Sequence, residues 1–293
     1  MDLSVRIGSL TLHNPVIAAS GCFGYGVEYA EVVDLASLGG VAVKGGMLNA
    51  IGLQGIGVHR FIDEKLPELR ARRATVIVNI CGTTLDEYVE LARILSDADG
   101  VAALELNISC PNIKEGGITF GCSLNGTFDV VSAVRKVTRL PVIPKLTPNV
   151  TDVASFARAS EEAGADAVSL VNTFLAMVID VETRRPRISN VVGGLSGPAI
   201  RPIAVRMVYE CQQTVKIPII GMGGIADARD AIEFIIAGAS AVQVGTANFV
   251  DPFIWPKLVN GIRAYMQRHQ IARISDLVGT VDTRARDKEW ISS

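Results

Sequence analysis

The sequence lacks the segments that would carry a protein into or through a membrane. No run is apolar for long enough to span a bilayer, and the N-terminal Met-Asp-Leu-Ser-Val-Arg has no apolar signal region. No cluster of Lys and Arg occurs, and the formal net charge is -2, which argues against a general nucleic-acid binder. We therefore expect a cytoplasmic protein that binds neither membranes nor nucleic acids.

Cysteine is scarce, and its spacing argues against two kinds of site. The chain has 5 cysteines, an odd number, and no two of them form a Cys-x-x-Cys pair. Widely spaced thiols are typical of a reducing compartment, so we expect no disulfide framework. The same spacing argues against an iron–sulfur cluster held by this chain alone.

A linker and a dinucleotide fingerprint are also absent. No low-complexity segment divides the 293 residues, so we expect residues 1–293 to form a single domain. Short apolar runs alternate with helical patterns, which predicts a (β/α)8 TIM barrel. A doubly wound open sheet is the alternative, but no Gly-x-Gly-x-x-Gly follows the first run. The expected strands are 15–20, 40–44, 75–80, 101–109, 141–147, 167–172, 217–221 and 241–245, and the expected helices include 84–96, 129–138, 153–163, 198–215 and 226–237.

Polar residues gather where the expected strands end, which is the end at which such a barrel carries its chemistry. The segment Asn107-Ile108-Ser109-Cys110-Pro111-Asn112 places a thiol and two carboxamides after an apolar run. Free cysteine titrates at about 8.5, so Cys110 suits proton transfer near neutral pH. The simpler interpretation of Cys110 is a small buried hydrophobe, but the flanking asparagines favour a functional thiol.

Glycine loops follow the last two expected strands. Gly221-Met222-Gly223-Gly224 and Gly245-Thr246 leave backbone N–H groups available to surround a phosphate, and the segment from Gly193 to Pro198 offers a third set. Tight turns without a ligand are the alternative, because glycine is the ordinary residue where φ is positive. Two such loops on consecutive strands favour a phosphate site.

Lys44 and Lys145 end two apolar runs, and a lysine in such a place requires a partner. One possibility is an internal salt bridge with Glu105, which alternates with Asn107 and should point into the barrel. The other is a ring with a phosphate tail that becomes anionic on reduction, and reduced FMN fits that description.

Several motifs, in this order along the chain, resemble class 1 dihydroorotate dehydrogenases. Those most similar to the class 1B catalytic subunit are Gly46-Met47-Leu48-Asn49-Ala50-Ile51-Gly52-Leu53-Gln54 and the segment Asn107 to Asn112. The others are Gly193 to Pro198, Ile220 to Gly224 and Val244 to Ala247. The resemblance implies FMN-dependent oxidation of (S)-dihydroorotate to orotate in UMP biosynthesis, with electrons passing to NAD.

The resemblance also implies roles for single residues. Cys110 would be the general base that takes the C5 proton of dihydroorotate, and residues 112–125 would form a lid over it, or else an ordinary surface loop. The implied FMN contacts are Ser20, Lys44, Gly45, Asn79, Asn107, Lys145, Val171, Gly197, Gly223, Gly224, Gly245 and Thr246. The implied substrate contacts are Lys44, Asn49, Ala50, Ile51, Gly52, Leu53, Asn107, Asn112, Asn172 and Thr173.

The family further implies a partner: an electron-transfer subunit with FAD and a 2Fe-2S cluster, joined to a catalytic homodimer in a heterotetramer.

The chain departs from the family at one place, because Lys44-Gly45 runs directly into Gly46-Met47, where relatives usually carry a longer connection. The rival interpretations are a fumarate-using class 1A enzyme, a dihydropyrimidine dehydrogenase-like module, a non-flavin phosphate-binding isomerase or lyase, and a catalytically inactive binding subunit.

Overall fold

The computed structural model describes residues 1–46, 56–108 and 120–284, and eight of its strands form a barrel. These strands are β3 (Val16–Ala18), β4 (Gly40–Gly46), β5 (Val76–Ile80), β6 (Val101–Asn107), β7 (Val142–Lys145), β8 (Val168–Leu170), β13 (Ile219–Met222) and β14 (Ala241–Val244). The barrel closes because β14 pairs in parallel with β3, through Val242↔Val16. This closure confirms the predicted (β/α)8 barrel and is incompatible with an open sheet.

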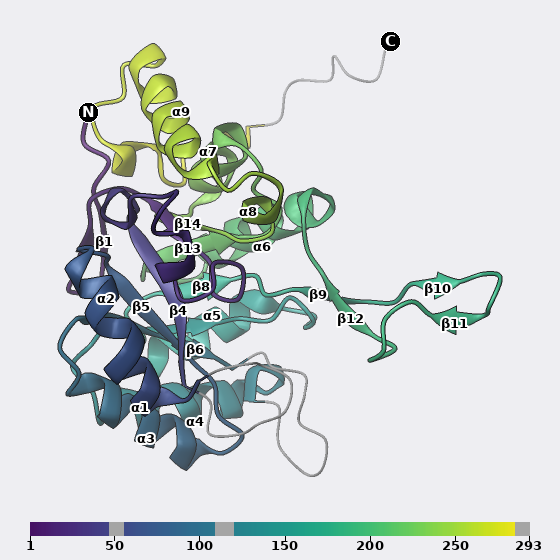
Figure 1. Ribbon diagram of the computed structural model, residues 1–293. Coiled ribbons are helices and arrows are strands. Elements are labelled where there is room, and N and C mark those ends of the chain that lie inside the picture. Colours follow the sequence, from purple (N-terminus) through teal and green to yellow (C-terminus); the bar gives the residue numbers. More distant parts are fainter. Residues whose placement is uncertain (47–55, 109–119, 285–293) are drawn as a thin grey trace.

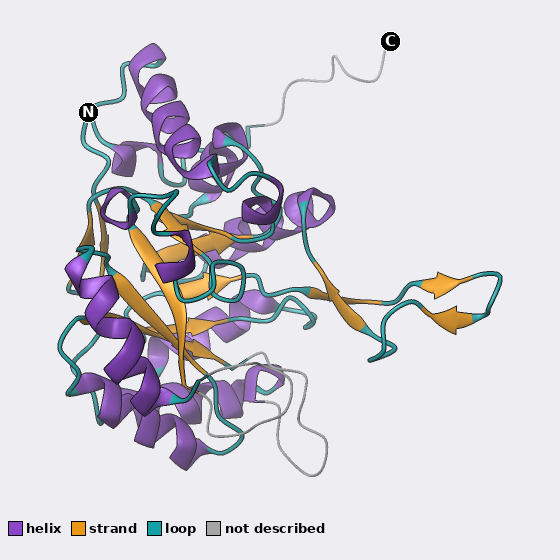
Figure 2. Cartoon of the chain, viewed as in Figure 1, coloured by secondary structure: helices purple, strands orange, loops and turns teal. Residues whose placement is uncertain are grey.

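Strand burial explains why the apolar runs were visible in the sequence. Every residue of β5, β13 and β14 is buried, as expected for parallel strands covered on both faces. The outer faces pack against helices, which surround the barrel in Figure 2. The main helices are α3 (Leu85–Ser96), α4 (Leu124–Arg135), α5 (Val153–Glu162), α6 (Arg201–Gln212), α7 (Ala228–Ala237) and α9 (Ile254–Arg268).

Side-chain caps fix the starts of several helices close to their expected positions. Thr84 and Glu87 form a capping box before α3, and Asp227 and Asp230 form one before α7. The expected helix at 129–138 is wrong at its start, because α4 is capped by Ser123 and begins at Leu124, five residues earlier than expected. The expected helix at 198–215 begins as a 3-10 helix (Pro198–Ile200) and continues as α6.

Two segments have structure that the sequence did not predict. Residues 58–71 form a continuous helical stretch of α1 (Val58–Arg60), a π-helix (Phe61–Lys65) and α2 (Leu66–Ala71). After β8, an arm extends away from the barrel (Figure 1). Its antiparallel pairs are β9 (Phe174–Ala176) with β12 (Gly193–Leu195) and β10 (Ile179–Asp180) with β11 (Arg185–Pro186).

The predicted lid at 112–125 is wrong in its last part. Residues 112–119 lie outside the described residues, but a 3-10 helix at Phe120–Cys122 is followed directly by α4. Gly121 donates its backbone N–H to the Ile108 carbonyl at 2.9 Å, which ties this end of the segment to the end of β6.

None of the helices in the described ranges is long and apolar enough to cross a bilayer.

Candidate functional site

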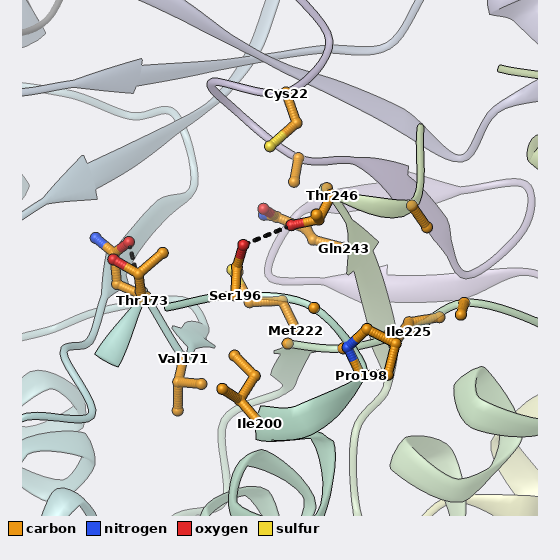
Figure 3. A pocket seen from close by; sticks show the side chains of 18 of the residues that line it. Cys22, Val171, Thr173, Ser196, Pro198, Ile200, Met222, Ile225, Gln243 and Thr246 are labelled. Carbon is orange, nitrogen blue, oxygen red and sulfur yellow. Dashed lines mark hydrogen bonds between the residues drawn. The ribbon is translucent and has the colours of Figure 1, made fainter. Parts of the chain in front are cut away.

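A cavity of about 300 Å³ opens at the carboxyl ends of the barrel strands (Figure 3). Its volume is within the range of small-molecule sites, and its place is the one at which barrel enzymes bind their ligands. Eight residues with a predicted role in FMN binding line it: Ser20, Lys145, Val171, Gly197, Gly223, Gly224, Gly245 and Thr246. Two predicted substrate contacts, Asn172 and Thr173, line it as well.

The glycine loops meet at one side of this cavity. Gly224 has φ +80°, and a Cβ there would lie 2.7 Å from the Gly197 carbonyl oxygen and 3.0 Å from the Arg201 backbone nitrogen. Only glycine allows this close approach of two backbone segments. Across the opening, the hydroxyls of Thr246 and Ser196 form a 2.8 Å hydrogen bond, drawn in Figure 3. The loops after β13 and β14 and the start of α6 therefore form one continuous rim.

Beneath the cavity, Glu105 organises the interior of the barrel. Its side chain is fully buried, and its Oε1 accepts hydrogen bonds from Ser169 Oγ at 2.8 Å and from Gln243 Nε2 at 2.6 Å. Its Oε2 accepts from Asn79 Nδ2 at 2.6 Å and lies 3.9 Å from Lys145 Nζ. A buried carboxylate is stable only when it is paired and hydrogen-bonded, and both conditions are met here. The salt bridge considered for Lys145 is thus present, and Lys145 also reaches the cavity.

Two cavity-lining residues have buried polar atoms that lack a hydrogen-bond partner within the described part of the chain. They are the Ser20 hydroxyl and the Gln243 Oε1 carbonyl oxygen. An unsatisfied buried polar group is unfavourable by about 1–3 kcal/mol. A ligand with polar edges would remove that penalty, so these residues, the loop glycines and Lys145 fit a ring with a phosphate tail.

A carboxamide cluster lies at the ends of β6 and β8. Asn172 Nδ2 lies 3.5 Å from Asn107 Oδ1, and the Asn107 carbonyl accepts a 2.8 Å hydrogen bond from the Tyr88 hydroxyl. The Thr173 N–H donates to Asn172 Oδ1 at 2.9 Å. Three predicted substrate contacts are therefore adjacent, although Asn107 is not among the residues that line the cavity.

Several predicted residues lie beside the cavity instead of in its wall. Lys44 and Asn79 are register partners in β4 and β5, and Gly45 follows Lys44 in β4. Asn79 reaches the site through Glu105, as described above. The remaining predictions lie outside the described residues: Asn49, Ala50, Ile51, Gly52, Leu53, Cys110 and Asn112.

Cys22 and Gln243 are among the cavity-wall residues that sequence reasoning missed. Burial raises the pKa of the Cys22 thiol, while the charges of Lys145 and Lys44 act in the opposite direction. Gln243 and Ser169 each interrupt a buried apolar strand. Because a polar side chain on such a strand must find a partner, that interruption was the available signal for the network around Glu105.

Comparison with known proteins gives a consistent result. A sequence profile of the family described as Dihydroorotate dehydrogenase matches residues 40–266. The chain is similar to a protein of Geotalea uraniireducens, with 50% identity over 301 residues that cover 96% of this chain and 99% of the relative. It is also similar to proteins of Bacteroides thetaiotaomicron (47% identity, covering 96% and 99%) and Porphyromonas gingivalis (50%, covering 94% and 97%). All three are named "Dihydroorotate dehydrogenase B (NAD(+)), catalytic subunit".

Proposed function

Because this chain belongs to the dihydroorotate dehydrogenase family, we propose that it oxidises (S)-dihydroorotate to orotate in pyrimidine biosynthesis, as a single barrel domain that binds FMN. The observation that carries the proposal is the cavity at the strand ends. It combines in one wall the glycine loops, the Lys145 ammonium and the polar atoms of Ser20 and Gln243 that have no partner in the described ranges. When bound, FMN supplies the acceptor for the hydride that leaves C6 of dihydroorotate.

We assign the phosphate of FMN to the rim formed by Gly197, Gly223, Gly224, Gly245 and Thr246. Backbone N–H groups at such loops suit an anion. Lys145 lines the cavity from β7 and pairs with Glu105, so it would supply positive charge to a flavin ring that gains electrons there. Ser20 and Val171 complete the cavity wall, while Lys44, Gly45, Asn79 and Asn107 approach from the neighbouring strand ends.

The substrate end of the proposed site is rich in amides. Asn107, Asn172 and Thr173 supply donors and acceptors that match a ring with alternating N–H and C=O groups. Lys44 suits the carboxylate of dihydroorotate, which dihydrouracil lacks. We expect Asn49 to Leu53 and Asn112 to add contacts from outside the described residues.

Cys110 is the proposed general base. It follows Asn107 by three positions, so it comes shortly after the end of β6 and next to the amide cluster in sequence. In the proposed reaction the C5 proton of dihydroorotate passes to the Cys110 thiolate, a hydride leaves C6, and a C5=C6 double bond forms. The neighbouring amides hold the ring in one orientation, which lowers the entropic barrier.

The test is flavin identity together with substrate choice. The purified chain should release FMN on heating, and dihydroorotate should bleach the bound flavin under anaerobic conditions. Dihydrouracil is the matched control, because it differs in lacking the carboxylate that Lys44 is proposed to bind. Release of FAD, or bleaching by dihydrouracil alone, would contradict the proposal, and a colourless protein after reconstitution would favour a non-flavin barrel.

For the partners, we propose an electron-transfer subunit that carries FAD and a 2Fe-2S cluster, and a homodimer of this chain within a heterotetramer. The word "subunit" in the names of the relatives supports a partner. The arm supports self-association, because Val178, Ile179 and Val181 are 54%, 53% and 80% exposed on it. Exposed apolar side chains in one short hairpin are typical of a protein contact.

A further inference from the structure

We propose that Glu105 is a positioning residue for the flavin: it fixes Lys145 and Gln243 at the cavity floor and balances the Lys145 charge, and so sets the reduction potential of the bound ring. The inference rests on the proposed function, because it places FMN in this cavity. Glu105 itself does not line the cavity and acts through side chains that do.

The contacts of Glu105 converge from four other strands of the barrel. Asn79 comes from β5, Lys145 from β7, Ser169 from β8 and Gln243 from β14. The carboxylate has no solvent exposure, and the Lys145 side chain is 8% exposed. Glu105 and Lys145 lie on the paired barrel strands β6 and β7, and sites built on strands are held more precisely than sites on loops, so the barrel sets their separation.

Lys145 is the cationic partner of Glu105 among the described residues. The two charges lie 3.9 Å apart, so a flavin ring bound in the cavity would experience an ion pair instead of a bare ammonium. A lone cation would favour the reduced, anionic ring strongly, and the carboxylate moderates this effect. Glu105 therefore lowers the reduction potential relative to a site with Lys145 alone.

The orientation of the Gln243 amide follows from the same carboxylate. Its Nε2 donates to Glu105 Oε1 at 2.6 Å, and its Oε1 has no hydrogen-bond partner among the described residues. The reversed amide would place the carbonyl oxygen against a negative oxygen, which is unfavourable. Glu105 thus leaves Gln243 with an acceptor available to a ring N–H, a group that the pyrimidine end of flavin has.

The test is the reduction potential of the protein-bound flavin in Glu105→Gln, measured by spectroscopic titration against reference dyes. The amide keeps the size of the side chain and removes its charge, so the potential should become more positive. A tenfold gain in the affinity for reduced over oxidised flavin corresponds to about 30 mV for a two-electron couple. Glu105→Asp, which keeps the charge but shortens the side chain, should lie closer to the wild type than Glu105→Gln. A purely structural role would give the reverse order, because the isosteric amide disturbs packing least.

Asp166→Asn is the matched control. Asp166 also pairs with a cation, Arg135, at 2.7 Å, but it precedes β8 at the opposite end of the barrel from the cavity. This variant should leave the potential unchanged. Should Glu105→Gln fail to fold, Ser169→Ala provides a milder test of opposite sign. It removes a donor to Glu105, so the carboxylate is less neutralised and the potential should become more negative.

An unchanged or lower reduction potential in a flavin-loaded Glu105→Gln protein would overturn this inference. An unchanged or higher reduction potential in Ser169→Ala would also overturn it. Neither result would affect the proposed function. A wild-type protein that takes up no flavin would instead overturn the proposed function. The flavin content of the wild type is therefore measured first.

Discussion

At the scale of single residues, Cys22 lines the cavity, yet its surroundings make it a poor base. Burial raises the pKa of its thiol, so the neutral form prevails at neutral pH. Cys110→Ala should therefore reduce dihydroorotate oxidation by about 10² to 10⁴, whereas Cys22→Ala should keep most of it. Both variants should retain FMN, measured as flavin per chain, and the rate of anaerobic flavin bleaching distinguishes them.

Cys110→Ser refines the same comparison. A hydroxyl is a much weaker acid than a thiol, so the residual activity should move to higher pH. If Cys110→Ala bleaches at the wild-type rate, or Cys22→Ala is the inactive variant, the assignment of the base is wrong.

A third thiol, Cys211, gives a prediction about stability and pH. It is fully buried in α6, and desolvation raises its pKa from 9.0 to about 12. In the unfolded chain the thiol ionises at the lower value, so its contribution to stability is complete below pH 9 and is lost as the pH rises towards 12. The free energy of unfolding should fall by up to about 1.4 kcal/mol per pH unit in this window because of Cys211.

Chemical denaturation of the wild type and of Cys211→Ala at several pH values measures this pH dependence of the free energy of unfolding. The alanine variant should be less stable at neutral pH because of the cavity it creates, but its stability should decline less steeply above pH 9. Parallel curves for the two proteins would show that Cys211 does not titrate in this way.

At the scale of elements, the start of α6 and the loop after β13 approach one another at Gly224. Gly224→Ala forces a Cβ to within 2.7 Å of the Gly197 carbonyl oxygen, and both backbone segments belong to the proposed phosphate rim. We expect FMN affinity to fall by about tenfold, which corresponds to about 1.4 kcal/mol. Fluorescence titration of the apoprotein with FMN measures this.

Gly57→Ala is the matched control. Gly57 has a similar φ of +88°, but a Cβ there would meet no atom of the described residues within 4 Å. Both substitutions place an alanine at positive φ, which is unfavourable by about 1–3 kcal/mol, but only Gly224→Ala adds crowding against the rim. Equal FMN affinities in the two variants would exclude the rim as the phosphate site.

The elements that the sequence predicted well are those with a long apolar pattern. All eight barrel strands were expected within a few residues, because strands buried on both faces have few polar residues to obscure the pattern. The arm was not expected, since its strands are only two or three residues long and none of their residues is buried. No periodicity develops over so short a segment.

The side-chain contacts within the candidate site could not be predicted from the sequence and required the three-dimensional structure. Its location followed from the polar strand ends, but the partners of Glu105 come from positions 26 and 64 residues away for Asn79 and Ser169, and 138 for Gln243. The pairing with Asn79 depends on the register of the adjacent strands β5 and β6, and those with Ser169 and Gln243 join β6 to strands that are not its neighbours. Local pattern encodes neither. The roles of the individual residues in binding FMN and dihydroorotate remain predictions.

At the scale of the whole molecule, the arm is an exposed apolar feature that self-association would cover. Ile179→Glu combined with Val181→Glu should convert a dimer of this chain to a monomer, because buried unpaired carboxylates oppose assembly. Light scattering after size-exclusion chromatography gives the mass directly. Val32→Glu, at a position 47% exposed outside the arm, is the control and should remain dimeric. A wild type that is monomeric, or an arm variant that stays dimeric, would place the contact elsewhere.

The assembled enzyme must also transfer electrons from reduced FMN to an external acceptor. The chain has no Gly-x-Gly-x-x-Gly after its first strand and no Cys-x-x-Cys pair, so the proposed route from reduced FMN to NAD passes through the FAD and 2Fe-2S cluster of a second subunit. The isolated chain should therefore reduce artificial dyes with dihydroorotate but reduce NAD slowly, and adding the electron-transfer subunit should raise the NAD rate without changing the dye rate. The dye assay serves as the internal control, because it reports the half-reaction that this chain performs alone. Rapid NAD reduction by the chain at its verified 293-residue mass would show that no second subunit is needed.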